Sequence, residues 1–386
     1  MRVLIAFDKF KDALSATEAG AAAAAALREK HPDWQLDLCP LTDGGEGFCE
    51  TLTRAVHGEL TTQSVSGPRG ERVNAPIGFI AAKNVSGSIR SRLAFENRDF
   101  KSENTLAVID LPSASGLALL APGRRDPWHT TTHGTGELLR QAAAGGAGAI
   151  LLGIGGSATN DLGLGALAAL GFRFFDAADV LIAVPTPSTW EKIQRIDRTG
   201  AIKLPPLFIA CDVTNALLGP RGATAVFGPQ KGLRPEAVTR LEAQAARMAA
   251  LLCAVCGQPL SSTETPGTGA AGGIAFGLMV AGGAKLVPGF DLVSAWLDLP
   301  ARLAAADLVL TGEGRFDATS FSGKGPGSLV AEARRLGKAV HVFAGSSSLP
   351  ADRSFHVITP AGMHLAEALP RSAELLAAAI TREFGH

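Results

Sequence analysis

Apolar runs of strand length alternate with longer amphipathic segments from the first residues of the chain. Residues 2–7 predict a strand, and the capping-box pattern Ser15-Ala-Thr-Glu18 predicts the start of an Ala-rich helix. Residues 34–41 predict a second strand, which a Gly-rich turn and a further helix follow. The chain therefore opens as strand, helix, strand and helix.

The pattern changes from residue 60 onward. Residues 60–66 and 72–80 alternate between apolar and polar positions, and the Gly-Pro-Arg-Gly sequence at 67–70 predicts a hairpin between them. Residues 82–104 are polar and irregular. The chain of 386 residues is longer than one ordinary core needs, so we expect a second domain to begin at this change.

Six further apolar runs predict buried strands. They are residues 105–111, 149–152, 207–210, 307–310, 339–344 and 355–359. Ala- and Leu-rich segments between them predict helices, including a long one over residues 235–256 and an amphipathic one that closes the chain. Strands that alternate with helices are typical of a parallel, doubly wound sheet, so the sequence predicts an α/β fold.

The run at 149–152 leads directly into GIGGSATND at residues 153–161. Glycines at a strand-to-helix turn let backbone N–H groups approach a ligand, and the following helix adds unpaired donors and the positive end of a dipole. Ser157 and Thr159 add side-chain donors, and Asp161 places a carboxylate beside them. One such turn can serve only to reverse the chain, but this combination predicts an anion site.

Other predicted strands also end in carboxylates and glycines. Asp8, Asp43 and Asp212 each follow a strand, and residues 311–317 read TGEGRFD after another. Each aspartate alone could simply cap a loop. The strands of a parallel sheet present their carboxyl ends at one edge, however, so we expect these groups to converge. Several carboxylates, amide donors and a few cations suit phosphoryl transfer with Mg²⁺.

Composition excludes several classes of partner. Lys plus Arg and Asp plus Glu are both 36, so with zero net charge neither a nucleic acid nor an acidic membrane surface is expected. Residues 142–160 are uncharged, but their glycines and turn signals argue against a membrane helix. The N-terminal apolar run is too short for a signal peptide, and the five cysteines fit a reducing compartment. We therefore expect a cytoplasmic protein.

Gly-rich motifs of other enzyme classes lack their required context. GTGAAG at residues 267–272 matches the dinucleotide pattern GxGxxG, but Ser/Thr/Glu-rich residues precede it instead of a strand. A nicotinamide-dependent oxidoreductase is therefore disfavoured, and helix-packing glycines are the preferred interpretation. Lys324 is followed by Gly, which excludes a Walker A loop, and Ser157 lacks the second glycine of a nucleophile elbow.

Eight motifs follow one another over nearly the whole chain. They are TDGGEG at 42–47, SASGL at 113–117, HGTGEL at 133–138, GIGGSATND at 153–161, CDVTN at 211–215, GATAVFGPQKG at 222–232, GTGAAGG at 267–273 and TGEGRFD at 311–317. Several are long and unusual strings. As an ordered set they resemble the bacterial glycerate kinase family.

The resemblance implies an ATP-dependent phosphotransferase that acts with Mg²⁺ on an alcohol group of D-glycerate, usually giving 2-phosphoglycerate and ADP. It also implies two α/β domains, the second inserted into a Rossmann-like first, with the active site in the cleft between them. We expect residues 1–60 and 282–386 in the Rossmann-like, doubly wound domain and residues 61–281 in the inserted domain. ATP and D-glycerate are the expected partners of a monomer or homodimer.

The matching motifs also supply the candidate site residues. Asp161 or Asp212 is expected to act as base or metal ligand. Lys11 and Arg315 are expected to hold the substrate carboxylate or a phosphate. The resemblance further assigns ATP to Gly155, Gly156, Ser157, Thr159, Gly312, Gly314 and Lys324, the substrate to Asp8, Ser113 and Ser115, and the metal to Asp43 and Asp317.

The chain departs from the family pattern at several positions. Phe7 and Lys9 stand in the first loop where proline and serine are usual. Leu162, His133 and Ala318 replace a glycine, a tyrosine and a glutamine. These changes concern substrate fit more than the phosphate frame. A kinase of a related small hydroxy acid therefore stays open, as does a non-catalytic ligand-binding or regulatory relative.

Overall fold

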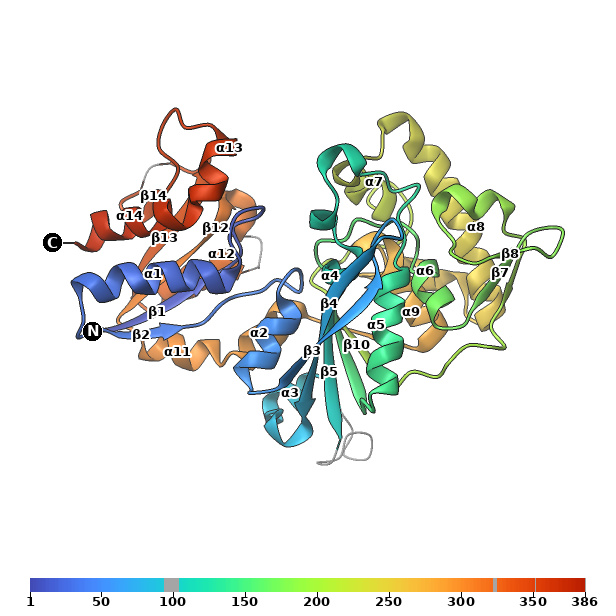
Figure 1. Ribbon diagram of the computed structural model, residues 1–386, viewed down its shortest axis with the longest axis horizontal. Coiled ribbons are helices and arrows are strands. Elements are labelled where there is room, and N and C mark those ends of the chain that lie inside the picture. The colour runs from blue at the N-terminus through green and yellow to red at the C-terminus, as the bar shows by residue number, and fades with distance from the viewer. Residues whose placement is uncertain (94–103, 322–324, 351, 386) are drawn as a thin grey trace. The chain divides into compact units, whose positions relative to one another are not determined.

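The computed structural model describes residues 1–93, 104–321, 325–350 and 352–385, and it divides into two compact units (Figure 1). Unit 1 comprises Met1–Asp43 and Val293–His386, and unit 2 is the intervening Gly44–Leu292. Unit 2 is thus an insertion into the chain of unit 1. Among the described residues, no helix is long and apolar enough to cross a membrane.

The two units meet in the chain after Asp43 and after Leu292, whereas the sequence predicts boundaries at residues 60 and 282. Helix α2 (Phe48–Ala55), placed in the first domain by the sequence analysis, contacts strands β4 (Arg72–Ala81) and β5 (Thr105–Asp110) of unit 2. The physical reason is a pair of buried hydrogen bonds: Cys49 donates from its backbone N–H to Asp110 and from its thiol to the carbonyl of Val108. The chain enters unit 2 before the predicted hairpin.

Unit 1 contains a five-stranded sheet in which every neighbouring pair is parallel. The strand order is β14-β13-β12-β1-β2. The strands are β1 (Arg2–Phe7), β2 (Gln35–Leu38), β12 (Leu308–Phe316), β13 (Ala339–Ser347) and β14 (Phe355–Val357). The predicted parallel α/β sheet is confirmed here, and it places the carboxyl ends of β1 and β12 side by side, with Phe7 opposite Gly312.

Helices cover the unit 1 sheet because its strands are apolar on both faces. Helices α1 (Ala16–Lys30) and α14 (Ser372–Phe384) contact each other and share a buried cluster with Ile5 and Leu310 (Figure 1). Helix α11 (Leu299–Ala305) contacts β1, and helix α12 (Gly325–Arg335) contacts β12 and β13. The predicted capping box at the start of α1 is confirmed. Shorter helices are α10 (Gly289–Trp296), which runs across the division between the units, and α13 (Leu365–Ala368).

Unit 2 contains a mixed six-stranded sheet of order β11-β10-β6-β5-β4-β3. Its remaining strands are β3 (Glu59–Ser66), β6 (Ala149–Gly153), β10 (Leu207–Ala210) and β11 (Lys285–Val287). The predicted hairpin is confirmed as the antiparallel pair β3–β4, and β4 also pairs antiparallel with β5. Strands β5, β6, β10 and β11 are parallel, so the loops after β5, β6 and β10 leave the same edge.

The core of unit 2 lies between its sheet and a layer of helices. Ile150 and Leu152 of β6 share one buried cluster with Leu139, Met248 and Phe276. Those three side chains belong to α5 (His133–Ala144), α8 (Val238–Cys256) and α9 (Ile274–Gly282) respectively. The other helices are α3 (Gly87–Arg92), α4 (Pro112–Ser115), α6 (Leu164–Ala169) and α7 (Ala223–Phe227). The long helix predicted over residues 235–256 is thereby confirmed as α8.

Several features were not predicted, among them strand β11 and helix α3, which lies in the segment expected to be irregular. Strands β7 (Arg173–Phe175), β8 (Leu181–Ile182) and β9 (Arg195–Asp197) form a small antiparallel sheet of order β8-β7-β9. Strand β12 continues through Phe316, so the predicted loop at residues 311–317 is wrong for most of its length. The reason is that β13 pairs with β12 as far as Phe316, so the Gly-rich sequence continues the strand.

Candidate active site

The loops after β5 and β6 in unit 2 are joined by backbone hydrogen bonds. The N–H of Leu117 donates to the carbonyl of Gly156 at 2.8 Å, and the N–H of Ala158 donates to that of Ser115 at 2.9 Å. Gly116 and Ser157 form a bridge between the loops. The two segments that the sequence singled out, 113–117 and 153–161, therefore form one structure at the carboxyl edge of the sheet.

Asp161 anchors this structure from inside. Its carboxylate is fully buried and accepts hydrogen bonds from the N–H and hydroxyl of Thr132, at 2.7 and 2.9 Å, and from the N–H groups of Gly163 and Gly165, both at 3.2 Å. Burial raises the pKa of Asp161, and the Thr132 hydrogen bonds oppose that rise. Donors of this kind offset part of the cost of burying a charge.

Lys231 is a second fully buried charged side chain beside the same loop. Its ammonium donates to the Ser157 hydroxyl at 2.8 Å and to the Thr159 carbonyl at 2.6 Å. Burial lowers the pKa of Lys231 to about 7, and the negative charge of Asp161 opposes that change. Lys231 therefore fixes the backbone on which the candidate phosphate donors lie. Among the described groups, the Thr159 hydroxyl has no hydrogen-bond partner.

Close backbone packing explains several glycines around this loop. A Cβ on Gly155 would lie 2.8 Å from the Cα of Gly45, and the N–H of Gly155 donates to the carbonyl of Gly44 at 3.0 Å. Gly272 has φ +71°, and a Cβ there would overlap the carbonyl of Thr159. The glycines at 267–273 therefore pack against the site loop, and the short helix Leu260–Glu264, not a strand, comes directly before them. The structure agrees with the packing interpretation of this motif.

Two further carboxylates lie at the carboxyl ends of strands: Asp110 is the last residue of β5, and Asp212 follows β10. Asp110 is fully buried and accepts hydrogen bonds from the N–H groups of Cys49 and Ser113 and from the Ser113 hydroxyl. The hydroxyl of Ser115 lies 2.9 Å from that of Thr135. Both serines predicted to bind substrate thus have partners within the protein.

Asp212 is only half-buried. Its two oxygens lie 3.2 and 3.0 Å from the backbone N–H of Phe290, which donates to them at the start of α10. One N–H cannot occupy both carboxylate oxygens fully, since an ionised carboxylate accepts about four hydrogen bonds. Asp212 therefore retains more capacity for a ligand than the enclosed Asp161.

Unit 1 gathers a different kind of site at the carboxyl ends of β1 and β12. Asp8 is buried at 7% exposure and accepts a hydrogen bond from the N–H of Lys9 at 2.7 Å. The Lys9 ammonium lies 3.1 Å from an oxygen of Asp43. Burial, reinforced by the negative charges of Asp43 and Glu313, raises the pKa of Asp8 to about 7. Unit 1 therefore holds several carboxylates that repel one another.

Glu313 is the member of this group that the sequence analysis did not assign. Burial raises its pKa, a hydrogen bond with the Ser320 side chain opposes that rise, and the negative charges of Asp43 and Asp317 add to it. Its Oε1 atom is buried with no hydrogen-bond partner among the described residues. The Arg315 side chain is exposed, and its Nε lies 3.0 Å from an oxygen of Asp317. A hard cation such as Mg²⁺ needs only one or two carboxylate oxygens beside its waters and phosphate oxygens, although no three of these described carboxylates have oxygens within 4.8 Å of one another.

The other candidates in unit 1 lie beside this group. A Cβ on Gly314 would lie 3.0 Å from the backbone nitrogen of Lys11, so the first loop approaches β12 at that point. A Cβ on Gly325 would lie 3.4 Å from an oxygen of Asp8, which places the start of α12 beside that carboxylate. Gly312 and Gly314, which the resemblance assigns to ATP, lie in strand β12. Lys324 lies outside the described residues.

The comparisons with known proteins agree in naming one family. A sequence profile of the glycerate kinase family matches residues 3–383. The chain belongs to the glycerate kinase family. Glycerate 2-kinase of Escherichia coli (strain K12) is 38% identical over 349 residues, which cover 90% of this chain and 85% of that protein. Glycerate kinase of Bacillus subtilis (strain 168) is 35% identical over 386 residues, covering 97% and 95%.

A solved structure supports the same assignment. The crystal structure assigned as glycerate kinase 2 from Salmonella typhimurium LT2 matches with a TM-score of 0.74 and 38% identity, covering 100% of this chain and 97% of that one. The predicted family resemblance and α/β fold are confirmed, and so is the prediction of a kinase.

For this glycerate kinase family member, the structure groups most of the predicted site residues within their own units. In unit 2, a backbone hydrogen bond joins Ser115 to the loop at 153–161, which contains Asp161, while Ser113 bonds to Asp110. In unit 1, Asp8 and Asp43 interact through Lys9 and by charge repulsion. Sequence reasoning missed Lys231, Asp110 and Glu313 as parts of these groups. For Lys231 and Glu313, the signal available in the sequence was a charged residue inside a matching motif. For Asp110, it was a charged residue near the end of an apolar run.

We expect the stability of the metal-free protein to depend on Asp8 between pH 4 and 7. The folded protein keeps a proton on Asp8 up to about pH 7, whereas the unfolded chain releases it near pH 3.8. The free energy of unfolding should therefore fall as the pH rises through this window, by on the order of 4 kcal/mol for this group. Urea denaturation in chelating buffer should show a smaller fall for Asp8→Asn than for the wild type.

The matched control is Asp33→Asn, which removes an exposed carboxylate just before β2. Its unfolding profile against pH should follow that of the wild type. A slope for Asp8→Asn equal to that of the wild type over pH 4–7 would show that Asp8 does not hold the proton.

Proposed function

We propose that this protein phosphorylates D-glycerate at the 2-hydroxyl, using ATP and Mg²⁺ and giving 2-phosphoglycerate and ADP. The name of the E. coli relative, glycerate 2-kinase at 38% identity, supports the position of transfer. The observation that carries the metal requirement is the buried, unpartnered oxygen of Glu313 beside Asp43 and Asp317. Phosphoryl transfer needs mainly positioning and neutralisation of charge, which such groups provide.

In unit 1 we assign Mg²⁺ to Asp43 and Asp317, as the resemblance implies, and we add Glu313. When bound, the ion supplies positive charge to phosphate oxygens. The high pKa of Asp8 lets it donate or accept a proton near neutral pH, which suits contact with the hydroxyl or carboxylate groups of glycerate. Lys11 and the exposed Arg315 are the cations proposed to hold the substrate carboxylate or a phosphate.

In unit 2 we propose the loop at 153–161 as the phosphate-binding element. Gly156 is exposed at the turn, Gly155 packs against Gly44 and Gly45, and the buried hydroxyl of Thr159 has no described partner. Ser157 lies beside Lys231, which holds it in place.

The two candidate bases of unit 2 receive different roles. Asp161 positions the loop, because its oxygens already accept hydrogen bonds from three residues. Asp212 is the better candidate for accepting the proton of the substrate hydroxyl, because it is half-buried and less fully hydrogen-bonded. The sequence left the choice between Asp161 and Asp212 open, and we propose Asp212 as the base.

The proposed activity is tested by coupled ADP release with D-glycerate, ATP and Mg²⁺. L-Glycerate, tartronate and a sample without acceptor serve as controls. We expect turnover selective for D-glycerate, and phosphorus NMR should identify 2-phosphoglycerate as the product. Turnover confined to another hydroxy acid would show that D-glycerate is not the substrate. A 3-phosphoglycerate product would show that transfer occurs at the 3-hydroxyl. Folded protein without any turnover would favour a non-catalytic relative.

The metal assignment is tested separately with Glu313→Gln. Loss of one carboxylate ligand should raise the free Mg²⁺ concentration needed for half-maximal activity by at least roughly 10-fold, at saturating ATP and D-glycerate. Asp33→Asn makes the same loss of charge in unit 1 outside the group and should leave this concentration unchanged. An unchanged Mg²⁺ dependence in Glu313→Gln would remove Glu313 from the metal site.

A further inference from the structure

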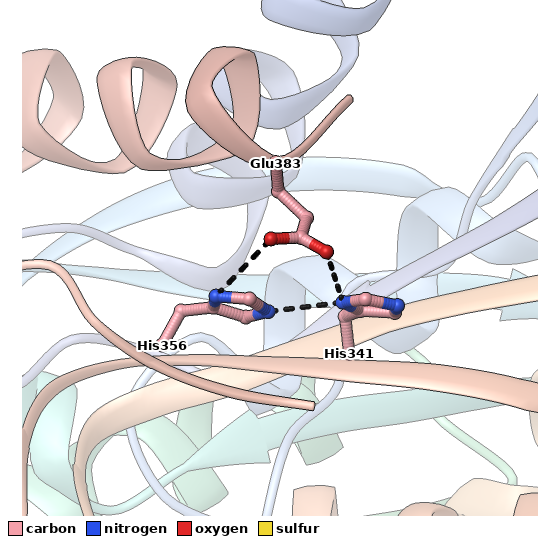
Figure 2. A group of neighbouring side chains, drawn as sticks. All are labelled: His341, His356 and Glu383. Carbon is pink, nitrogen blue, oxygen red and sulfur yellow. Dashed lines mark hydrogen bonds and ion pairs between the residues drawn. The ribbon is translucent and has the colours of Figure 1, made fainter. Parts of the chain in front are cut away.

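Two histidines and a glutamate meet on the sheet of unit 1 away from the carboxylates of the proposed site. His341 lies in β13, His356 in β14 and Glu383 in the last turns of α14 (Figure 2). Nδ1 of His341 is 2.9 Å from Nε2 of His356. The Glu383 oxygens lie 3.6 Å from Nδ1 of His341 and 3.8 Å from Nδ1 of His356. Three elements that are distant in sequence thus direct ligand-type atoms at one point.

The spacing of these atoms suits a small tetrahedral ion. One candidate ligand atom from each residue can be chosen so that all lie within 4.8 Å of one another. Bonds of about 2.0–2.2 Å at tetrahedral angles place two ligand atoms roughly 3.3 Å apart. The observed 2.9 and 3.6 Å separations lie on either side of that value. Small side-chain rotations therefore bring the three atoms to coordination distance.

The surroundings hold the rings in place and leave an open side. Phe343 stacks on His356 at 4.6 Å between ring centroids, and Phe384 meets His341 edge-on at 5.0 Å. The side chains of His341, His356 and Glu383 remain 20%, 17% and 36% exposed. Three protein ligands with partial exposure leave room for water as a fourth ligand. Burial lowers the pKa of both histidines, which favours the neutral rings that ligate metals.

This cluster differs from the proposed Mg²⁺ site in place and in chemistry. His341 is opposite Leu310 in the middle of β12, whereas Glu313 and Asp317 lie at the carboxyl end of that strand and beyond it. Its donors are two imidazole nitrogens and one carboxylate, which suit Zn²⁺ and related first-row ions better than Mg²⁺.

We propose that His341, His356 and Glu383 form a binding site for one Zn²⁺-class ion that ties helix α14 to strands β13 and β14. The ion stabilises the C-terminal part of unit 1 and takes no part in phosphoryl transfer.

The test measures Zn²⁺ binding by the untagged, full-length protein after chelator treatment, with excess Mg²⁺ present to occupy oxygen sites. Equilibrium dialysis should give one equivalent of Zn²⁺, and Tm should rise with Zn²⁺ concentration. At free Zn²⁺ about 100 times Kd, the folded-to-unfolded ratio should increase roughly 100-fold. His356→Gln and Glu383→Gln should each lose the bound equivalent and the rise in Tm.

His129→Gln is the matched control. It removes a histidine that lies 2.7 Å from a carboxylate, that of Asp126, in unit 2. This variant should bind Zn²⁺ as the wild type does. Equal loss of binding in His129→Gln and His356→Gln, or no bound equivalent in the wild type, would overturn the proposal.

Co²⁺ added to the unaltered chain gives a second measurement that does not depend on whether a variant folds. The proposed nitrogen-containing, four-coordinate site should produce the intense visible absorption of tetrahedral Co²⁺, and equimolar Zn²⁺ should remove it. Only the weak spectrum of octahedral Co²⁺ would contradict the site.

Discussion

The buried carboxylate of Asp161 is the constraint on which the carboxyl edge of unit 2 depends. It accepts hydrogen bonds from Thr132, Gly163 and Gly165, and so joins the segment before α5 to the loop after β6 and the start of α6. An uncompensated charge at this position would cost several kcal/mol. The nearby ammonium of Lys231 adds hydrogen bonds to the same loop. Backbone geometry in this loop is therefore fixed before any ligand binds, which is what preorganised catalysis requires.

The carboxylates of unit 1 are in the opposite situation, because they repel one another. Its carboxylates lie close enough to raise the pKa of Asp8 and Glu313, and one Glu313 oxygen has no described partner. Such a group is unfavourable by itself, because burial and repulsion both act against the charged forms. Unit 2 thus holds a buried charge whose hydrogen bonds shape a loop, whereas unit 1 holds carboxylates whose mutual repulsion raises the pKa of Asp8 and Glu313.

The sequence predicted the parts of this architecture that depend on local pattern. The strand at 149–152, the capping box at Ser15 and the hairpin after residue 60 follow from periodicity and turn residues, and all three are present. The length of β12 could not be predicted in this way, because beyond Gly312, where the pairing with β1 ends, the strand continues through pairing with β13. The small sheet of β7, β8 and β9 has strands of two or three residues, too short for a periodic signal.

The sequence predicted the site in outline, but it did not predict the role of each charged side chain. Asp8, Asp161 and Asp212 were candidates because each follows a predicted strand. Whether such a carboxylate is enclosed by donors or open to a ligand depends on distant segments. Thr132 encloses Asp161, and only the fold brings Lys231 beside the same loop. These contacts span 29 residues between Thr132 and Asp161 and 74 between Lys231 and Ser157.

The most direct test of this account compares Asp161→Asn with Asp212→Asn by thermal unfolding and steady-state kinetics. We predict that Asp161→Asn lowers Tm markedly, because an amide cannot accept from all four donors. Asp212→Asn should keep Tm within a few degrees, since the side-chain oxygen of Asn can still accept from the Phe290 N–H, while kcat falls by about 10²–10⁴-fold. A stable Asp161→Asn protein that has lost kcat, together with an active Asp212→Asn, would contradict the account.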